Sequence, residues 1–176
     1  MSIKPDLTVA AIIERDGQFL MVEERANNRM VFNQPAGHVE RGEQIIDAVI
    51  RETLEETAWK FHPEALVGIY FWEQPERNRA FLRFAFSGQV SDHDPTRTLD
   101  RGIERAAWMT PHELTIRASR LRSPMVMRGI EDYQAGHRFP LEILRGLLPD
   151  LSSARDIRSR VADLSTAQSL IANPRV

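Results

Sequence analysis

Residues 37–59 read Gly-His-Val-Glu-Arg-Gly-Glu-Gln-Ile-Ile-Asp-Ala-Val-Ile-Arg-Glu-Thr-Leu-Glu-Glu-Thr-Ala-Trp, and no other stretch constrains the architecture as strongly. No Gly or Pro interrupts the stretch between Glu43 and Thr57. Apolar and small side chains recur there at helical spacing, which predicts an amphipathic helix with one face toward a core. The predicted core-facing residues are Ile46, Val49, Ile50, Thr53 and Thr57.

Three carboxylates form an acidic stripe on this predicted helix. Glu52, Glu55 and Glu56 stand at i, i+3 and i+4, so they fall within an arc of about 100°. Like charges at this spacing destabilise an isolated helix, so we expect cations over them. Arg51 can supply one positive charge. Mg²⁺ suits the rest because it prefers carboxylate oxygens, although a solvated acidic face is the alternative for these three residues alone.

The wider pattern resembles the Nudix box, G-x5-E-x7-R-E-U-x-E-E-x-G-U, in which U is a bulky apolar residue. Each charged position of the box is matched in this chain, by Glu43, Arg51, Glu52, Glu55 and Glu56. The chain is therefore identified as a member of the Nudix hydrolase family. The resemblance implies an α+β fold, an α/β/α sandwich in which a mixed β-sheet lies between helices and the box forms a loop-helix-loop.

Three weaker positions depart from the box. Thr53 places a hydroxyl at a usually aliphatic position, and this hydroxyl needs a partner such as the carbonyl one turn back. Ala58 replaces the closing Gly, whose φ is normally positive, and a Cβ there costs about 1 kcal/mol or more. We therefore expect the loop after the helix to take a different path. Trp59 is bulky but not aliphatic.

The resemblance also implies roles for the box residues. Mg²⁺, or Mn²⁺ in its place, would be bound by Gly37 through its carbonyl and by Glu52, Glu55 and Glu56. Such ions neutralise phosphate oxygens and activate water.

Four residues are candidates for the catalytic set. Arg51 would orient the carboxylates, and Glu43 would pair with Arg51 to fix the preceding loop to the helix. Either Glu56 or Glu104 would remove the proton of the attacking water. In many Nudix enzymes an acidic residue shortly before the Trp of this strand lies near the metals, and Glu104 is the candidate for that residue here.

Segments outside the box resemble a phosphatase subgroup of the family, the NudJ group. Residues 33–38 read Asn-Gln-Pro-Ala-Gly-His, residues 121–124 read Leu-Arg-Ser-Pro, and residues 133–142 read Tyr-Gln-Ala-Gly-His-Arg-Phe-Pro-Leu-Glu. The resemblance covers residues 5–148, which we predict to be the Nudix domain. Residues 149–176 are predicted to be a C-terminal tail, either helical or disordered.

The subgroup resemblance implies Mg²⁺-dependent hydrolysis of nucleoside tri- and diphosphates, thiamine pyrophosphate and hydroxymethylpyrimidine pyrophosphate, with release of phosphate. Two alternatives stay open: a pyrophosphatase acting on ADP-ribose or nucleotide sugars, and a non-catalytic Nudix-fold nucleotide sensor. Candidate substrate contacts are Arg83 and Arg122, whose guanidinium groups could bind phosphate, and Phe32, which could stack on a ring. Trp72 and Phe71 are further stacking candidates, and core packing is the alternative for all three aromatic residues.

Composition narrows the class of protein. The chain has 176 residues, 42% of them hydrophobic and 27% charged, which is ordinary for one globular domain. The net charge of −2 does not favour nucleic-acid polymers or anionic membranes as partners. The absence of Cys fits a reducing compartment, and no signal peptide or membrane-spanning run is evident. These features fit a cytoplasmic protein, and the family resemblance implies a small-molecule di- or triphosphate substrate. We expect a monomer or homodimer.

Apolar and β-branched runs predict strands at residues 7–13, 19–22, 31–34, 66–72, 80–90 and 103–109. An Asp-Gly pair at residues 16–17 predicts that the first two strands form a hairpin. Polar loops are predicted at residues 23–28, 73–79 and 91–102, the last of which could cover the site. Thr110 and Ser123 are predicted N-caps of two further helices, each followed by Pro at the first helical position.

Overall fold

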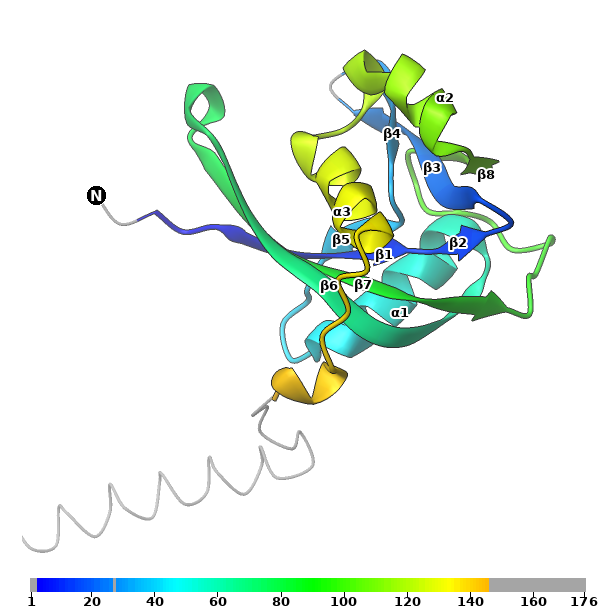
Figure 1. Cartoon of the computed structure of the whole chain (residues 1–176). Helices are drawn as coiled ribbons and strands as arrows, with labels where there is room; N and C mark the ends of the chain where they lie inside the picture. The colour runs from blue at the N-terminus through cyan, green and yellow to red at the C-terminus, as the bar shows by residue number, and fades with distance from the viewer. Residues whose placement is uncertain (1–2, 27, 146–176) are drawn as a thin grey trace, which may run out of the picture. The chain divides into compact units, whose positions relative to one another are not determined.

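The structure is a computed structural model that describes residues 3–26 and 28–145 (Figure 1). The predicted tail, residues 149–176, lies outside the described residues. The strands are β1 (Asp6–Ile12), β2 (Glu14–Arg15), β3 (Gln18–Ala26), β4 (Arg29–Asn33), β5 (Ala36–His38), β6 (Lys60–Gln74), β7 (Arg79–Ser91) and β8 (Ile103–Met109). The α-helices are α1 (Ile45–Thr57), α2 (Pro111–Ile116) and α3 (Pro124–Gln134), and the 3-10 helices are η1 (Pro75–Arg77), η2 (Ala118–Arg120) and η3 (Leu141–Ile143).

The strands form two sheets. The first has the order β5-β1-β7-β6, in which β1 is antiparallel to β5 but parallel to β7, so the sheet is mixed. The second has the order β2-β3-β4, and β8 pairs with the other edge of β3.

Alternate residues of β1 face two separate core clusters, because successive side chains of a strand point to opposite faces. Ala10 and Ile12 belong to the cluster that includes residues of α3. Val9, Ala11 and Ile13 belong to the cluster that includes residues of α1. The first sheet therefore lies between α1 and α3 (Figure 1), and the predicted α/β/α sandwich is confirmed.

The predicted hairpin of residues 7–13 and 19–22 is wrong in its pairing. Of the two strands that precede β3, the short β2 (Glu14 and Arg15) pairs with it. Strand β1 pairs instead with β5 and β7 of the other sheet. The reason is burial: β1 is covered on both faces, which is typical of a strand with a parallel neighbour. The loop predicted at residues 23–28 is also too long, because β3 continues to Ala26. Glu23 is accommodated there by ion pairs with Arg105 and Arg120.

Strands β6 and β7 are longer than the sequence predicts. They pair from Lys60 and Ser91 at one end to Gln74 and Arg79 at the other. The loop predicted at residues 73–79 shrinks to η1 and Asn78, whose backbone is left-handed with φ 48°. The extra length brings the far end of this hairpin into the functional site described below.

Helix α1 begins at Ile45 and ends at Thr57, as the periodicity indicates. The Thr53 hydroxyl donates to the Val49 carbonyl at 2.7 Å, which confirms the predicted partner one turn back. Ala58 has φ 61° and ψ 15°, and its N–H donates to the Leu54 carbonyl at 3.0 Å. The chain thus leaves the helix along the path that a Gly would take, and the expected change of path is wrong. The Asp94 N–H donates to the Ala58 carbonyl, which helps to hold this conformation.

The other two α-helices begin where the sequence predicts but are capped differently. Thr110 and Glu113 form a reciprocal capping box at the start of α2. Ser123 precedes Pro124 at the start of α3, yet its hydroxyl makes no capping hydrogen bond. In residues 3–26 and 28–145, no helix has both the length and the apolar character that crossing a bilayer requires.

Candidate active site

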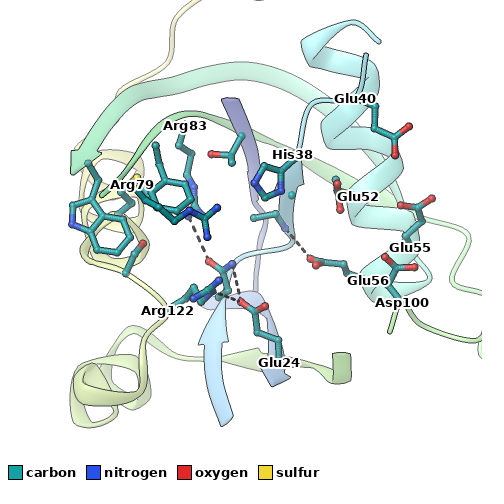
Figure 2. Close-up of a pocket in the computed structure, with 18 of the residues that line it drawn as sticks. Glu24, His38, Glu40, Glu52, Glu55, Glu56, Arg79, Arg83, Asp100 and Arg122 are labelled. Atoms are coloured by element: carbon teal, nitrogen blue, oxygen red, sulfur yellow. Dashed lines mark hydrogen bonds and ion pairs between the residues drawn. The ribbon is translucent and has the colours of Figure 1, made fainter. Parts of the chain in front are cut away.

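A cleft of about 590 Å³ is lined by residues from Thr8 of β1 to Met125 of α3. Its two sides carry opposite charge (Figure 2). The acidic wall comprises Glu40, Glu52, Glu55, Glu56 and Asp100. The basic wall comprises Arg79, Arg83 and Arg122. Such a cleft can receive a polyanion together with the cations that its carboxylates require.

Arg51 organises the acidic wall. Its Nε and Nη2 donate to the two carboxylate oxygens of Glu43 at 2.8 and 2.9 Å, so the ion pair expected from the sequence is present. Its Nη1 donates to Glu52 at 2.9 Å and to Glu55 at 3.0 Å. The hydrogen bonds from Arg51 hold the pKa of Glu43 below its usual range, and those carboxylates raise the pKa of Arg51. One guanidinium thereby fixes the rotamers of three carboxylates.

Gly37 of β5 leaves space for Glu52. A Cβ at position 37 would overlap the Glu52 carboxylate. Position 37 therefore requires Gly because the Glu52 side chain approaches its backbone closely, independently of any role of the Gly37 carbonyl. Of the predicted metal-binding set, Gly37, Glu52, Glu55 and Glu56 all line the cleft.

Glu56 is the most buried carboxylate of the acidic wall, with an exposed fraction of 8%. The Ala36 N–H donates to its Oε2 at 2.8 Å. Burial raises the pKa of Glu56 well above its usual range, against the effect of the Ala36 N–H, and the charges of Glu52, Glu24 and Asp100 raise it further. Burial also raises the pKa of Glu52, against the effect of Arg51. Glu52 is already paired with the Arg51 guanidinium, and a divalent cation would favour the ionised form of both carboxylates.

The donor set fits a hard divalent cation. Glu52, Glu55 and Glu56 each use one oxygen in a hydrogen bond, and within the described residues the second oxygen of each has no hydrogen-bond donor. In their present rotamers, no three acidic or histidine side chains of the described residues converge closely enough to hold an ion. All-oxygen coordination of the kind that these carboxylates offer is what Mg²⁺ prefers.

Arg83 of β7 is buried in the basic wall, with an exposed fraction of 6%. Its Nη1 makes a long hydrogen bond of 3.5 Å to Asn33 Oδ1. Burial lowers the pKa of Arg83 to about 10, so the side chain keeps its charge at neutral pH. Arg122 lies beside Glu24, with 3.4 Å between Nε and Oε1. Both predicted phosphate-binding arginines thus line the cleft.

Phe32, the aromatic residue that we predicted to contact the substrate, is not one of the aromatic residues that line the cleft. Phe32 has an exposed fraction of 2%, belongs to a core cluster and does not line the cleft, so its placement does not support stacking on a substrate. Phe71 is exposed and also lies outside the lining. Trp72 and Phe81 do line the cleft, as a stacked cross-strand pair with ring centroids 5.5 Å apart.

Glu104 is exposed on β8 and does not line the cleft, so the structure does not bring it to the other carboxylates. Asp100 lies there instead, and its N–H donates to the Glu55 carbonyl at 3.0 Å. Glu24 also reaches the cleft and was missed. Neither residue stands out in the sequence, because Asp100 is one of several acidic residues in a polar loop and Glu24 stands in a run predicted to be a loop.

Comparison with known proteins agrees with this geometry. The model of the NUDIX domain family matches residues 4–128, and the chain belongs to this family. It is a hydrolase of the class that cleaves pyrophosphate bonds, which such enzymes generally do with a divalent metal ion.

Among its relatives are phosphatases called NudJ. The chain is 39% identical over 141 residues to Phosphatase NudJ of Shigella boydii serotype 4, and equally so to that of Escherichia coli strain K12. Each alignment covers 80% of this chain and 91% of the relative.

Solved structures support the same fold. A NUDIX hydrolase from Nitrosomonas europaea is 51% identical, with a TM-score of 0.79, over 81% of this chain and 97% of that one. An Ap4A hydrolase from C. elegans is 18% identical, with a TM-score of 0.57, over 74% of this chain and 96% of that one. The second likeness concerns the fold alone.

Proposed function

We propose that this Nudix hydrolase removes the terminal phosphate from nucleoside tri- and diphosphates, and from thiamine pyrophosphate and hydroxymethylpyrimidine pyrophosphate. The observation that carries the proposal is the pair of oppositely charged walls in one cleft. The carboxylates would bind the cations that a diphosphate needs, and the arginines would bind phosphate oxygens directly. The relatives called phosphatases favour release of inorganic phosphate.

The acidic wall would hold Mg²⁺, or Mn²⁺ in its place, through Glu52, Glu55, Glu56 and the Gly37 carbonyl. When bound, the ion supplies charge neutralisation of the diphosphate and lowers the pKa of a water nucleophile. Arg51 keeps Glu52 and Glu55 in place, and Glu43 holds Arg51 by its bidentate ion pair.

Of the two predicted general bases, Glu56 has the better placement. It lines the cleft, whereas Glu104 is exposed outside it. Burial raises the pKa of Glu56 in the metal-free protein, and a bound cation would favour the ionised form that can accept a proton. Arg83 and Arg122 would bind the phosphates on the other side, and the Trp72–Phe81 pair would take the place of Phe32 as the platform for an aromatic ring.

A product assay tests the proposal. Phosphate release is measured directly, without an added pyrophosphatase, over ADP, ATP, thiamine pyrophosphate and ADP-ribose, with Mg²⁺ and with EDTA. Mg²⁺-dependent release of free phosphate from the diphosphates is expected. Cleavage of ADP-ribose alone, to AMP without free phosphate, would contradict phosphate release and favour the nucleotide-sugar pyrophosphatase.

Glu56→Gln should lower kcat by roughly 10²- to 10⁴-fold, because it removes both a metal ligand and the base. Glu104→Gln is the matched control, since it makes the same chemical change outside the cleft, and its kcat should stay within about threefold of the wild-type value. An equal loss in both variants would remove Glu56 from its proposed role.

A further inference from the structure

Three polar side-chain atoms of the cleft are buried without a hydrogen-bond partner in the described residues. They are Thr8 Oγ1, Arg83 Nε and Ser123 Oγ. Each parent residue is at most 6% exposed, and each lines the cleft. Native proteins satisfy most buried polar atoms, so three unpartnered atoms in one cleft require an explanation.

The fold brings these three residues together from distant parts of the chain. Thr8 and Arg83 are register partners on the parallel strands β1 and β7, so their side chains lie next to each other on the same face of the sheet. Ser123 immediately precedes α3, and Met125 of that helix lines the same cleft. The first N–H groups of a helix have no partner within the helix, so this end of α3 adds a partial positive charge.

The chemistry of these groups points to an anion. Arg83 can only donate hydrogen bonds, and the Thr8 and Ser123 hydroxyls can each donate one. Arg83 is charged and buried, and its hydrogen bond to Asn33 is long and has an uncharged acceptor. The carboxylate of Glu24 already interacts with Asn33 and Arg122. A buried cation of this kind is costly unless an anion accepts its remaining hydrogen bonds.

The neighbouring residues indicate which anion this is. Phe81 stands two residues before Arg83 on β7 and so shares its face of the sheet, and Trp72 stacks on Phe81. Figure 2 shows Arg83 on the opposite side of the cleft from Glu52, Glu55 and Glu56. In the sheet order β5-β1-β7-β6, the strand that carries Arg83 lies between β6, which carries Trp72, and the strands β1 and β5. A substrate whose ring lies on Trp72 and whose terminal phosphate lies at the carboxylates would place its inner phosphate at Arg83.

We propose that Thr8, Arg83 and Ser123 form an anion subsite that binds the inner phosphate, which the substrate retains after hydrolysis. The assignment rests on the proposed function, because it orients a diphosphate between this subsite and the acidic wall. It makes these residues determinants of specificity: a compound with an inner phosphate next to the leaving phosphate is bound at both ends of the cleft. A simple phosphate monoester engages one end only.

The test removes the two hydroxyls without removing volume or charge elsewhere. Thr8→Val and Ser123→Ala should each raise KM for ADP and thiamine pyrophosphate by roughly tenfold while kcat stays within about twofold, because the lost contacts act on binding. Thr115→Val, a change of the same kind outside the cleft, is the control and should leave both constants unchanged. Thermal stability of the two cleft variants should match the wild type, since these hydroxyls have no partner in the fold.

A binding measurement separates failure of the subsite from failure of the proposed function. AMP and thiamine monophosphate are the retained halves of the test substrates, and their affinities are measured by calorimetry with Mg²⁺ absent. Both cleft variants should weaken this binding roughly tenfold, even if the enzyme proved to use another substrate. Unchanged affinity and unchanged KM would overturn the subsite, whether or not phosphate is released. A weakened inhibition by inorganic phosphate, with monophosphate affinity unchanged, would also overturn it by assigning the subsite to the leaving group.

Discussion

Ala58 carries a methyl group in a backbone conformation that glycine adopts at much lower cost. Its φ of 61° is left-handed, and the residue is buried at the end of α1. A Cβ in this region costs roughly 1–2 kcal/mol. The conformation persists because hydrogen bonds from both sides determine it, through the Ala58 N–H to Leu54 and the Ala58 carbonyl to the Asp94 N–H.

Ala58→Gly should therefore raise the free energy of unfolding by up to about 1 kcal/mol, after the larger entropy of Gly in the unfolded chain is subtracted. Urea unfolding measures the change. Ala48→Gly is the control, because Ala48 is buried near the start of the same helix, and it should lower the free energy by about 1 kcal/mol or more. Equal destabilisation by the two changes would show that Ala58 is not strained.

Glu56 makes stability depend on pH in metal-free protein. Its folded-state pKa lies above the usual value of 4.5, so the folded state binds more protons than the unfolded state. Its contribution is therefore most favourable at low pH and is lost as pH rises from about 4.5 through the folded-state pKa. In EDTA, Glu56→Gln should raise Tm by an amount that grows with pH.

Thermal melts from about pH 5 to pH 8 measure this difference. Glu104→Gln, at an exposed carboxylate, should give a difference from the wild type that does not change with pH. Mg²⁺ should reduce the advantage of Glu56→Gln, because a bound cation favours the ionised carboxylate that the variant lacks. A difference that shrinks with pH in EDTA would contradict the direction assigned to the Glu56 pKa.

At the scale of elements, the N-termini of α2 and α3 use similar residues for different purposes. The Thr110 hydroxyl accepts from the Glu113 N–H at 3.2 Å, and Glu113 accepts from the Thr110 N–H at 2.8 Å. The Ser123 hydroxyl has no such partner. Thr110→Ala should lower the free energy of unfolding by about 1 kcal/mol, whereas Ser123→Ala should change it by less than about 0.5 kcal/mol. Chemical denaturation of both variants is the measurement, and an equal loss would show that Ser123 caps its helix.

Trp59, which departs from the family pattern, connects the catalytic helix to two other segments. Its ring stacks on His93 with centroids 4.6 Å apart, and the Arg15 guanidinium lies 4.8 Å from its ring centroid. The same polar loop is held to α1 by the Asp94 and Asp100 N–H groups. A large aromatic side chain at position 59 thus helps to anchor the loop that brings Asp100 to the cleft.

At the scale of the whole molecule, the cleft lining within the described residues runs from Thr8 to Met125. Both core clusters of the described residues are formed by side chains between Val9 and Leu144. Removal of residues 149–176 should therefore change Tm by less than about 3 °C and leave kcat/KM for ADP within about twofold. Melting curves and phosphate-release rates on the shortened chain give the answer. A large loss of either would mean that the domain predicted at residues 5–148 is incomplete.

Features that arise within a few turns of one helix or at its ends could be predicted from the sequence. Examples are the acidic stripe of α1, the ion pair between Arg51 of this helix and the nearby Glu43, and the first residues of α2 and α3. Helical periodicity and Pro at the first helical position are local, so they can be read without knowing what packs nearby.

Which distant residues share the cleft depends on how the strands pair in three dimensions. Sheet register places Thr8 beside Arg83, and a loop bound to α1 brings Asp100 to the acidic wall. Phe32 was a candidate for stacking on the substrate with core packing as the alternative, and the pairing of β4 with β3 buries it in the core. These outcomes depend on which strand pairs with which over tens of residues, and the composition of a strand does not specify its partner.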